Sequence, residues 1–285
     1  MEIRKVKAVF FSPTGTSEKI TKTIAEVVAK ELDINAESFD FTLPKNRLEP
    51  IIFDSEELVI FGLPVIAGRV PNVLLEFLSK IQGNGAIVIP IVMFGNRSYD
   101  DALIELRDIL LKGGLIPIAA GAFVGEHSFS KTLGKGRPDK DDLLKAEVFA
   151  TLVAEKLIGF GNLKKDTAED IDEKSLNIIK VKGKEYPYGG YYKPLDQDDN
   201  HIDIRKVKPK TGDQCIDCKI CANACPMGSI DYEEVSRVPG ICIKCGACIK
   251  KCPVQAKYFD DPGYLYHKKD LEEKFAKRAE AEIFI

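Results

Sequence analysis

The chain contains, at residues 215–226, the pattern Cys215-x-x-Cys218-x-x-Cys221-x-x-x-Cys225-Pro226, and 27 residues later the same spacing returns as Cys242-x-x-Cys245-x-x-Cys248-x-x-x-Cys252-Pro253. All eight cysteines of the chain belong to this repeat. Three thiolates at every third position can wrap one tight loop around a single cubic metal–sulfur cluster. The fourth thiolate follows a longer gap and is directed away from its own loop. The repeat therefore predicts two metal–sulfur centres.

Two other uses of cysteine remain open at this point. Structural zinc is also held by cysteines two residues apart, but Zn²⁺ takes four ligands from two pairs, so the third cysteine of each run would be left over. Disulfide bonds would have to form among cysteines only a few residues apart, which leaves little suitable geometry, and we expect a reducing compartment. Zinc and disulfides therefore explain the spacing less well than a cluster.

The repeat resembles the ligand motif of bacterial two-cluster ferredoxins, in which the fourth cysteine of each run serves the other cluster. The resemblance implies two 4Fe–4S clusters. The cluster-one cysteines would be Cys215, Cys218, Cys221 and Cys252, and the cluster-two cysteines would be Cys242, Cys245, Cys248 and Cys225.

The bulk composition is that of a globular protein, with 45% hydrophobic residues, 30% charged residues and a formal net charge of −3 over 285 residues. This charge argues against a nucleic-acid partner and leaves no polybasic patch for a membrane surface. The sequence has no run of eighteen apolar residues and passes from Met1 directly into a strand-like segment. We therefore expect no membrane-spanning helix, no signal peptide and a cytoplasmic protein.

The loop that follows the first predicted strand, residues 6–11, is rich in hydroxyl groups. It reads Ser12-Pro13-Thr14-Gly15-Thr16-Ser17, and apolar residues at helical spacing follow from Ile20 to Leu32. A strand, a glycine-containing hydroxyl loop and a helix form a phosphate-binding layout, because the helix N-terminus supplies backbone N–H groups and partial positive charge. Four hydroxyls without a lysine favour a phosphate monoester over the Walker and dinucleotide loops. The alternative is an ordinary capped helix.

Apolar segments at 37–41, 58–64, 86–94 and 115–124 continue the alternation of strands with helices. Strands that are apolar on both faces indicate a parallel sheet covered by helices on both sides. Ligands of such sheets bind beyond the carboxyl ends of the strands. The loops after strands one, three, four and five are therefore expected to form one binding rim.

The phosphate loop and the alternation over residues 1–158 resemble the flavodoxins, and this resemblance implies FMN. The predicted fold is a flavodoxin-like, five-stranded, doubly wound parallel α/β sheet with a small C-terminal α+β two-cluster ferredoxin domain. By position, the FMN phosphate would be held by Ser12, Thr14, Gly15, Thr16 and Ser17. The isoalloxazine ring would lie among residues of two later loops, namely Pro64, Val65, Ile66, Ala67, Gly68, Phe94, Gly95, Asn96, Arg97, Tyr99 and Asp100.

The loop at 65–68 lacks the aromatic residue that many flavodoxins place against the ring. Tyr99 is therefore the expected stacking residue, and the other face of the ring is expected to be open. Arg69 and Arg97 lie in rim loops, where a cation would stabilise reduced flavin, although either could instead pair with a carboxylate. His127 could donate a proton to reduced flavin or serve no such role.

We expect four segments: the FMN domain at 1–158, a linker packed between domains at 159–208, the cluster domain at 209–262 and a helical tail at 263–285. The linker holds an aromatic stretch at 186–194 that mixes tyrosines with Pro and Gly, which is poor material for a flexible tether. We expect it to pack on the flavin rim or between domains. In the tail, Asp270 is expected to cap a short helix. The cluster domain is neutral, with seven basic and seven acidic residues, which favours an electron partner on the same chain.

Joined to the cysteine repeat, the chain resembles the flavodoxin–ferredoxin fusions of anaerobic bacteria and archaea. The resemblance implies an electron-transfer protein that passes single electrons between FMN and two clusters, with other redox proteins as partners. The alternative is a ferredoxin-dependent flavin reductase that acts on a quinone, a nitro compound or dioxygen. No G-x-G-x-x-G pattern follows a predicted strand, so direct oxidation of nicotinamide has no support. A homodimer is a further possibility, in which the clusters of one chain meet the flavin of another.

Overall fold

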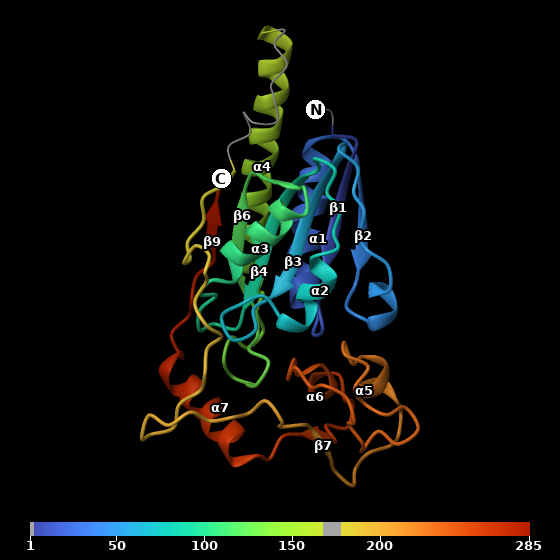
Figure 1. Ribbon diagram of the computed structural model, residues 1–285, viewed down its shortest axis with the longest axis vertical. Helices are drawn as coiled ribbons and strands as arrows, with labels where there is room; N and C mark the ends of the chain where they lie inside the picture. Colours follow the sequence, from blue (N-terminus) through green and yellow to red (C-terminus); the bar gives the residue numbers. More distant parts are fainter. Residues whose placement is uncertain (1–2, 168–177) are drawn as a thin grey trace.

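The computed structural model describes residues 3–167 and 178–285, and its elements follow the alternation expected for a parallel α/β sheet (Figure 1). Residues 168–177 of the predicted linker lie outside the described part. The strands and helices of the larger domain are β1 (Lys5–Phe10), α1 (Thr16–Glu31), β2 (Asn35–Asp40), β3 (Glu57–Pro64), α2 (Leu75–Leu78), β4 (Ile87–Phe94), α3 (Ala102–Lys112), β5 (Ile116–Pro117), β6 (Ala120–Val124) and α4 (Lys140–Thr167).

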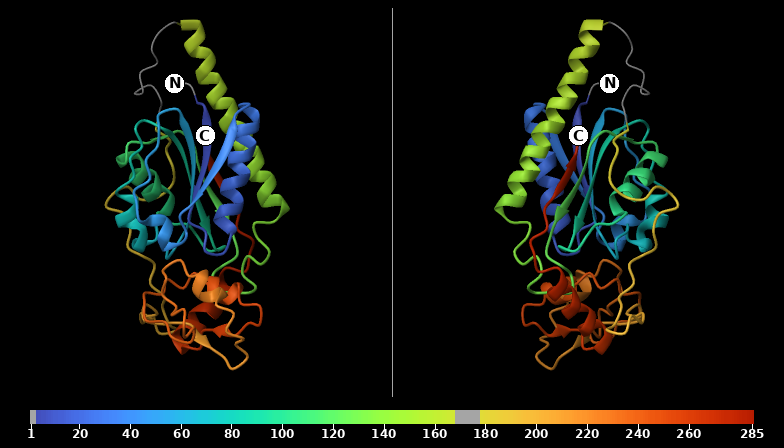
Figure 2. Two further views of the ribbon diagram at one scale, coloured as in Figure 1. Left: turned by 90° about the vertical axis from the view of Figure 1, so that its right-hand side faces the viewer. Right: turned by 90° about the vertical axis from the view of Figure 1, so that its left-hand side faces the viewer.

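The sheet has the strand order β2-β1-β3-β4-β6, with β5 also paired to β4, and all of these pairs are parallel. This is the doubly wound order with its reversal between β1 and β3. Helices α1 and α4 cover one face, and α2 and α3 cover the other (Figure 2). The central strand β4 is buried at every position, as a strand covered on both faces should be. The expected fifth strand at 115–124 is present as β5 and β6, interrupted at residues 118–119.

The C-terminal tail adds a strand that the sequence did not predict. Residues Glu282–Phe284 form β9, which pairs antiparallel with β6 and extends the sheet at its edge. The helix α7 spans Pro262–Lys274, and its N-cap is Asp261, whose carboxylate accepts a hydrogen bond from the Tyr264 N–H at 2.9 Å. The expectation that Asp270 caps a helix is therefore wrong, because Asp270 lies inside α7. The earlier proline at residue 262 is a favourable first helical residue.

The cysteine-containing segment folds as a small α+β unit. Its elements are the two-stranded antiparallel pair β7 (Lys210–Thr211) and β8 (Lys257–Tyr258), and the short helices α5 (Ile220–Asn223) and α6 (Ala247–Lys250). This unit lies below the carboxyl ends of the parallel strands (Figures 1 and 2). The ligand-binding edge of the sheet therefore faces the cysteines of the same chain. Among the described residues, no helix combines the length and apolar character needed to cross a membrane.

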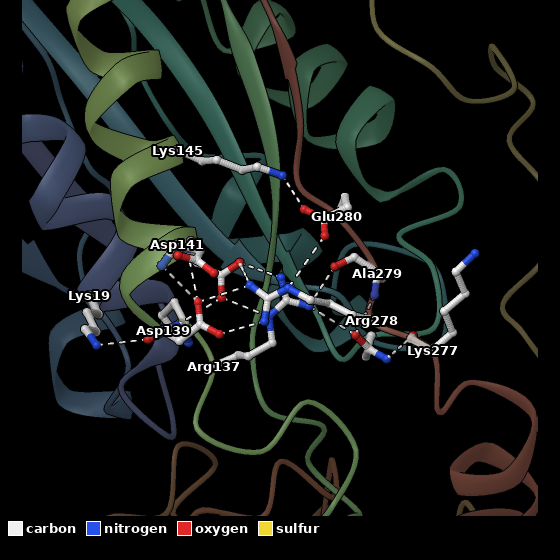
Figure 3. A network of polar contacts seen from close by, with 12 residues as sticks. Lys19, Arg137, Asp139, Asp141, Lys145, Lys277, Arg278, Ala279 and Glu280 are labelled. Carbon is white, nitrogen blue, oxygen red and sulfur yellow. Dashed lines mark hydrogen bonds and ion pairs between the residues drawn. The ribbon is translucent and has the colours of Figure 1, made fainter.

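A buried polar network attaches the tail to the sheet domain (Figure 3). Arg137 pairs with Asp142, with a distance of 2.8 Å from Nε to Oδ2, and donates to the Ala279 carbonyl at 2.7 Å. Asn96 donates through Nδ2 to the carbonyls of Phe275 and Lys277 at 2.7 and 2.9 Å, while its Oδ1 accepts from the Ala279 N–H at 3.0 Å. Outside this core, Arg278 pairs with Asp139. The tail is therefore held to the sheet by side chains as well as by β9.

The change Asn96→Gly should release the tail, because it removes these hydrogen bonds at a buried position. Glycine tolerates the left-handed backbone of Asn96, where φ is 64°, so the loss of the side chain dominates. We expect the unfolding free energy to fall by about 2–3 kcal/mol, with faster amide hydrogen exchange in β9. The matched control is Asn84→Gly, also at a positive φ of 47° but with one carbonyl contact, to Phe53. An equal effect of both changes would contradict the role of Asn96.

Candidate functional site

The cluster-one cysteines line one cavity. Its lining contains Cys215, Cys218, Cys221 and Cys252, together with apolar side chains that include Ile216, Ile220 and Val254. The fourth cysteine comes from the second half of the repeat. The structure therefore brings together the set that the ferredoxin resemblance implied.

The cluster-two cysteines line a second cavity. Its lining contains Cys225, Cys242, Cys245 and Cys248. In the described part of the chain, no three His, Cys, Asp or Glu side chains converge closely enough to hold a single metal ion. The cysteines of each set are instead spread around a cavity.

Backbone geometry explains how each run of three cysteines wraps its cavity. The residues on both sides of the second cysteine are left-handed, with φ of 52° and 61° at Asp217 and Lys219, and of 56° and 76° at Lys244 and Gly246. These positions curl the loop, and a short helix follows in both halves. The fourth cysteines are also equivalent, since each sulfur accepts a backbone N–H from four residues later. The distances are 3.3 Å from Ser229 N to Cys225 Sγ and 3.2 Å from Ala256 N to Cys252 Sγ.

Burial makes these thiols poor acids on their own. Removal from water raises the pKa of both Cys245 and Cys248 to about 12, and it also raises the pKa of Cys242 and of Cys221. Thiolates are the form that binds iron, so the positive charge of iron must displace the protons. Four soft sulfur donors around each cavity fit an iron–sulfur cluster.

The phosphate loop precedes the N-terminus of α1. Gly15 adopts a left-handed conformation with φ of 88° and provides no side-chain cap for the helix. The Ser12 N–H donates to Thr42 Oγ1 at 2.7 Å, and Ser12 Oγ accepts from the Glu18 N–H at 2.9 Å, which fixes the loop. The buried Ser17 hydroxyl has no hydrogen-bond partner. The N-terminus of α1, capped at Glu18 by Ser12 but not by its own N-cap residue, lies beside the unpaired Ser17 hydroxyl, and this arrangement fits a phosphate group.

The ring-binding loops depart from the sequence prediction at Tyr99. Tyr99 is only 6% exposed, packs on Phe94 with ring centroids 5.5 Å apart, and donates its hydroxyl to Glu282 at 3.0 Å. Burial and this carboxylate raise its pKa. The expectation that Tyr99 stacks on a flavin is therefore not supported, because both its ring and its hydroxyl are already used in the core and by β9.

Two polar residues of the same loop are also engaged. Asn96 directs its amide to the tail, as described above, so it is not free to bind a ligand. Arg97 forms an ion pair with Asp100, which is one of the alternatives that the sequence left open. The other loop turns sharply at Ala67 and Gly68, both left-handed, with Ile66 and Arg69 joined by two backbone hydrogen bonds.

Tyr192 is an aromatic side chain that the structure brings to this rim, and it belongs to the stretch 186–194 that was expected to pack on the rim or between domains. Its N–H donates to the Ala67 carbonyl at 2.8 Å, and its ring lies 4.4 Å from the Arg97 guanidinium carbon. The ring of His267, on α7, stacks on it with centroids 5.7 Å apart. The only sequence signal was the unusual tyrosine content of residues 186–194. Tyr192 thus joins the two ring-binding loops to α7.

Arg69 anchors the aromatic stretch of the linker. It forms a two-point ion pair with the buried Glu105, at 2.8 and 2.6 Å, and donates to the Gly189 carbonyl. Its guanidinium lies 4.8 and 5.2 Å from the ring centres of Tyr188 and Tyr191. Because these partners occupy the guanidinium, Arg69 is not available as a cation for a flavin.

His127 and His267 are two histidines near the rim. His127 accepts a hydrogen bond through Nδ1 from the Phe129 N–H at 3.1 Å, and its ring lies against Gly95. Burial lowers the pKa of each histidine to about 4, and the cation of Arg97 contributes to both shifts. Nδ1 of His267 is buried without a hydrogen-bond partner. Both imidazoles are therefore neutral at pH 7.

The cysteine unit contacts the sheet domain mainly around the second cavity. Arg47 donates to the carbonyls of Phe41 and Pro226, at 2.8 and 2.6 Å, and Pro226 follows the cluster-two residue Cys225. Lys250 pairs with Glu126 at 2.7 Å. Ile243, between two cluster-two cysteines, packs against the core that contains the ring-binding loops.

Comparisons with known proteins agree with this architecture. Residues 214–256 match the family model of the 4Fe-4S dicluster domain. Among solved structures, the chain is similar to the flavodoxin from Streptococcus pneumoniae TIGR4 (19% identity over 53% of this chain and 99% of that one, TM-score 0.37) and to flavodoxin 2 from Bacillus cereus (19% identity, 54% and 99%, TM-score 0.38). It is also similar to the rubredoxin oxygen:oxidoreductase of Desulfovibrio gigas (16% identity, 55% and 37%, TM-score 0.39). No curated protein sequence matches the chain.

The chain thus combines a doubly wound parallel α/β sheet with a C-terminal segment that matches the model of the 4Fe-4S dicluster domain. Proteins use such clusters to carry electrons, and their reduction potentials are set by the surrounding protein. The combination supports an electron-transfer redox role.

The change His267→Phe should make the protein less sensitive to acid, since it keeps a ring against Tyr192 and removes a titrating group. A histidine whose folded pKa is depressed binds more protons when unfolded, so stability falls as the pH drops from its ordinary pKa of 6.5 towards about 4. When the pH is lowered from 7 to 5, the unfolding free energy of the wild type should fall by about 2 kcal/mol more than that of the variant. Urea unfolding of the anaerobic holoprotein at both pH values measures this difference. The exposed His201, changed to Phe, is the control for replacing a histidine by phenylalanine at a surface position.

Proposed function

We propose that this protein is an electron carrier in which FMN, bound at the rim of the sheet, exchanges single electrons with two 4Fe–4S clusters. The observation that carries this proposal is the contact of the cluster-two cavity with the rim of the same chain. The carbonyl of Pro226, next to Cys225, accepts a hydrogen bond from Arg47. Gly246 lies so close to the loop after β6 that an added Cβ would be 2.6 Å from the Ser128 carbonyl oxygen. Cluster two would therefore be the neighbour of the flavin, with cluster one on its far side.

The phosphate end of the flavin site has the best-supported residues. Ser12, Thr14, Gly15, Thr16 and Ser17 would hold the phosphate with hydroxyl and backbone N–H groups. Residues 64–68 and Gly95 remain candidates for contact with the ring, whereas Tyr99 and Asn96 do not. Bound FMN supplies a centre that accepts one or two electrons, so it can join one-electron and two-electron carriers. The surrounding chain would exclude water and fix the ring beside the cluster unit.

The covered rim favours a carrier over the alternative of a flavin reductase. Tyr192, His267 and the cluster unit lie over the loops that a small acceptor would have to reach. A homodimer is not needed to bring cluster two to the rim. Other redox proteins remain the proposed partners.

An anaerobic redox titration with EPR, on protein assayed for iron, sulfide and FMN, tests the proposal. We expect about eight irons and one FMN per chain and two interacting cluster signals. Protein with intact clusters that binds no FMN would overturn the flavin assignment, and zinc in place of iron would overturn the cluster assignment.

Pairs of cysteine changes test the exchange of ligands between the two halves. The pair Cys215→Ser and Cys252→Ser removes two ligands of one cluster, so about four irons per chain should remain. The pair Cys215→Ser and Cys225→Ser removes one ligand from each cluster and should impair both. Iron assay and EPR of the two variants give the result. If the second pair spared one whole cluster and the first pair lost both, the ligands would not be exchanged.

The change Ser17→Ala should weaken FMN binding, because it removes a buried hydroxyl that otherwise lacks a partner. A hydrogen bond to a charged phosphate contributes about 1.5 kcal/mol, so the dissociation constant should rise roughly tenfold. Quenching of FMN fluorescence on titration into flavin-free protein measures this constant. Thr23→Ala is the control, since Thr23 lies on the same helix with its hydroxyl bonded to the Lys19 carbonyl. Equal affinity of the two variants would remove Ser17 from the phosphate site.

A further inference from the structure

The cluster unit is neutral as a whole but strongly polarised. Residues 213–234 contain five carboxylates and one lysine, whereas residues 235–258 contain five basic residues and no carboxylate. The basic half includes Lys250, which pairs with Glu126 of the sheet domain, and Lys244, which is buried. Basic groups are thus directed in part to the rest of the chain, and the acidic half is left with uncompensated charge.

Contacts bring the acidic residues to one surface, which we call the cluster-one face and define as residues 213–220 and 231–234. Lys219 joins its two segments, because its Nζ lies 2.8 Å from the Asp217 carboxylate and 2.9 Å from the Glu233 carbonyl. Asp213, Asp217, Glu233 and Glu234 are exposed. Lys219 pairs with Asp217 and Arg237 pairs with Glu234, so Asp213, Asp231 and Glu233 are left without an ion-pair partner among the described residues and give the face its net negative charge.

Exposed apolar residues lie at the centre of this face. Ile216 is 63% exposed and Ile220 is 39% exposed, and both line the cluster-one cavity. Cys218, between them in sequence, is the one cysteine of the chain that is classed as exposed. An apolar centre with a charged rim is the usual anatomy of a protein interface. Here that centre lies directly over the cavity of a redox centre.

The cluster-two cavity has a different environment. Ile243 packs against the core of the sheet domain, Gly246 is buried against the Ser128 backbone, and Cys245 is half-buried. The unit reaches the sheet domain through residues 226–228 and 243–255. The cluster-one face takes part in none of the contacts just described and is the open side of the unit.

We propose that the cluster-one face is the docking surface for an external electron carrier, and that this partner is a protein with a basic face. The inference rests on the proposed function and adds the surface at which electrons enter or leave the protein. One electron passes between cluster one and the metal or flavin centre of the partner: one is oxidised as the other is reduced, and no atom or proton is transferred. Carboxylates attract a basic partner over about 10 Å at moderate salt, and the apolar centre then excludes water at the contact.

Charge reversal on this face tests the proposal. Asp213 and Glu233 are suitable because both are exposed and no side-chain partner holds either carboxylate within the described residues. The double variant Asp213→Lys and Glu233→Lys is compared with Glu26→Lys and Glu155→Lys, which change two exposed carboxylates on α1 and α4 by the same amount of charge. The probe is basic cytochrome c, mixed in a stopped-flow instrument with the dithionite-reduced holoprotein. Anionic hexacyanoferrate(III) serves as a second oxidant.

For the cluster-one variant, the second-order rate constant with cytochrome c should fall roughly tenfold at low ionic strength, and the difference should disappear at high salt. The rate with hexacyanoferrate(III) should rise instead. The control variant should differ from the wild type by less than about twofold with either oxidant. Equal changes of the rate constant in the two variants, or a rate constant with cytochrome c that does not depend on ionic strength, would overturn the proposal of a docking surface.

The same samples separate this inference from the proposed function. Iron, sulfide and FMN contents of all variants must equal those of the wild type for the rates to be compared. A wild-type protein without iron, or one whose reduced form passes no electron to either oxidant, would remove the proposed function itself. Full cofactor content with unchanged rates in the cluster-one variant would remove only the docking surface.

Discussion

Parallel hydrogen bonding of buried strands is the constraint on which the arrangement of this protein depends. Strands β1, β3, β4 and β6 run in one direction, so their carboxyl ends and the loops that follow meet at one rim. The sheet is covered by helices on both faces, which leaves its edges and rims as places where another unit can dock. The cluster unit and the tail occupy the carboxyl rim and one edge. Every candidate redox site therefore lies at the same end of the domain.

Attachment of the C-terminal region changes what the rim residues do. Asn96 and Tyr99 follow β4, where a flavodoxin-like protein is expected to contact its ring. Here Asn96 binds the tail backbone and Tyr99 is bonded to Glu282 beside β9. Each side chain can satisfy only a limited number of hydrogen bonds, and partners from the tail take up those of Asn96 and Tyr99. Tyr192, from the linker, lies in the same region.

The tertiary structure decides which charged side chains of the cluster unit face solvent and which face the sheet domain. The cluster unit is neutral in sequence, yet its acidic and basic halves face different surroundings. Lys250 meets Glu126, whereas the carboxylates near Ile216 face solvent. A neutral segment can therefore present an acidic surface on one side.

The local patterns of the sequence predicted the alternation of strands and helices, because hydrophobic spacing is set along one element. The assignment of each fourth cysteine to the other half of the repeat came from the ferredoxin resemblance, and the phosphate loop stays a prediction. The expectation that Asp270 caps a helix was wrong, and β9 was missed. The structure engages the side chains of Tyr99 and Asn96 with the tail instead of leaving them open to a ring. The contacts of Tyr99, Asn96 and Tyr192 and the pairing of β9 depend on residues about 90 to 180 positions apart in the chain, such as Tyr99 with Glu282 or Tyr192 with Arg97, whereas the start of α7 at Asp261 is a local feature. Hydrophobic periodicity and ligand spacing are set by neighbours in sequence, whereas the choice of partner for a buried polar group is set by which distant segment is brought against it.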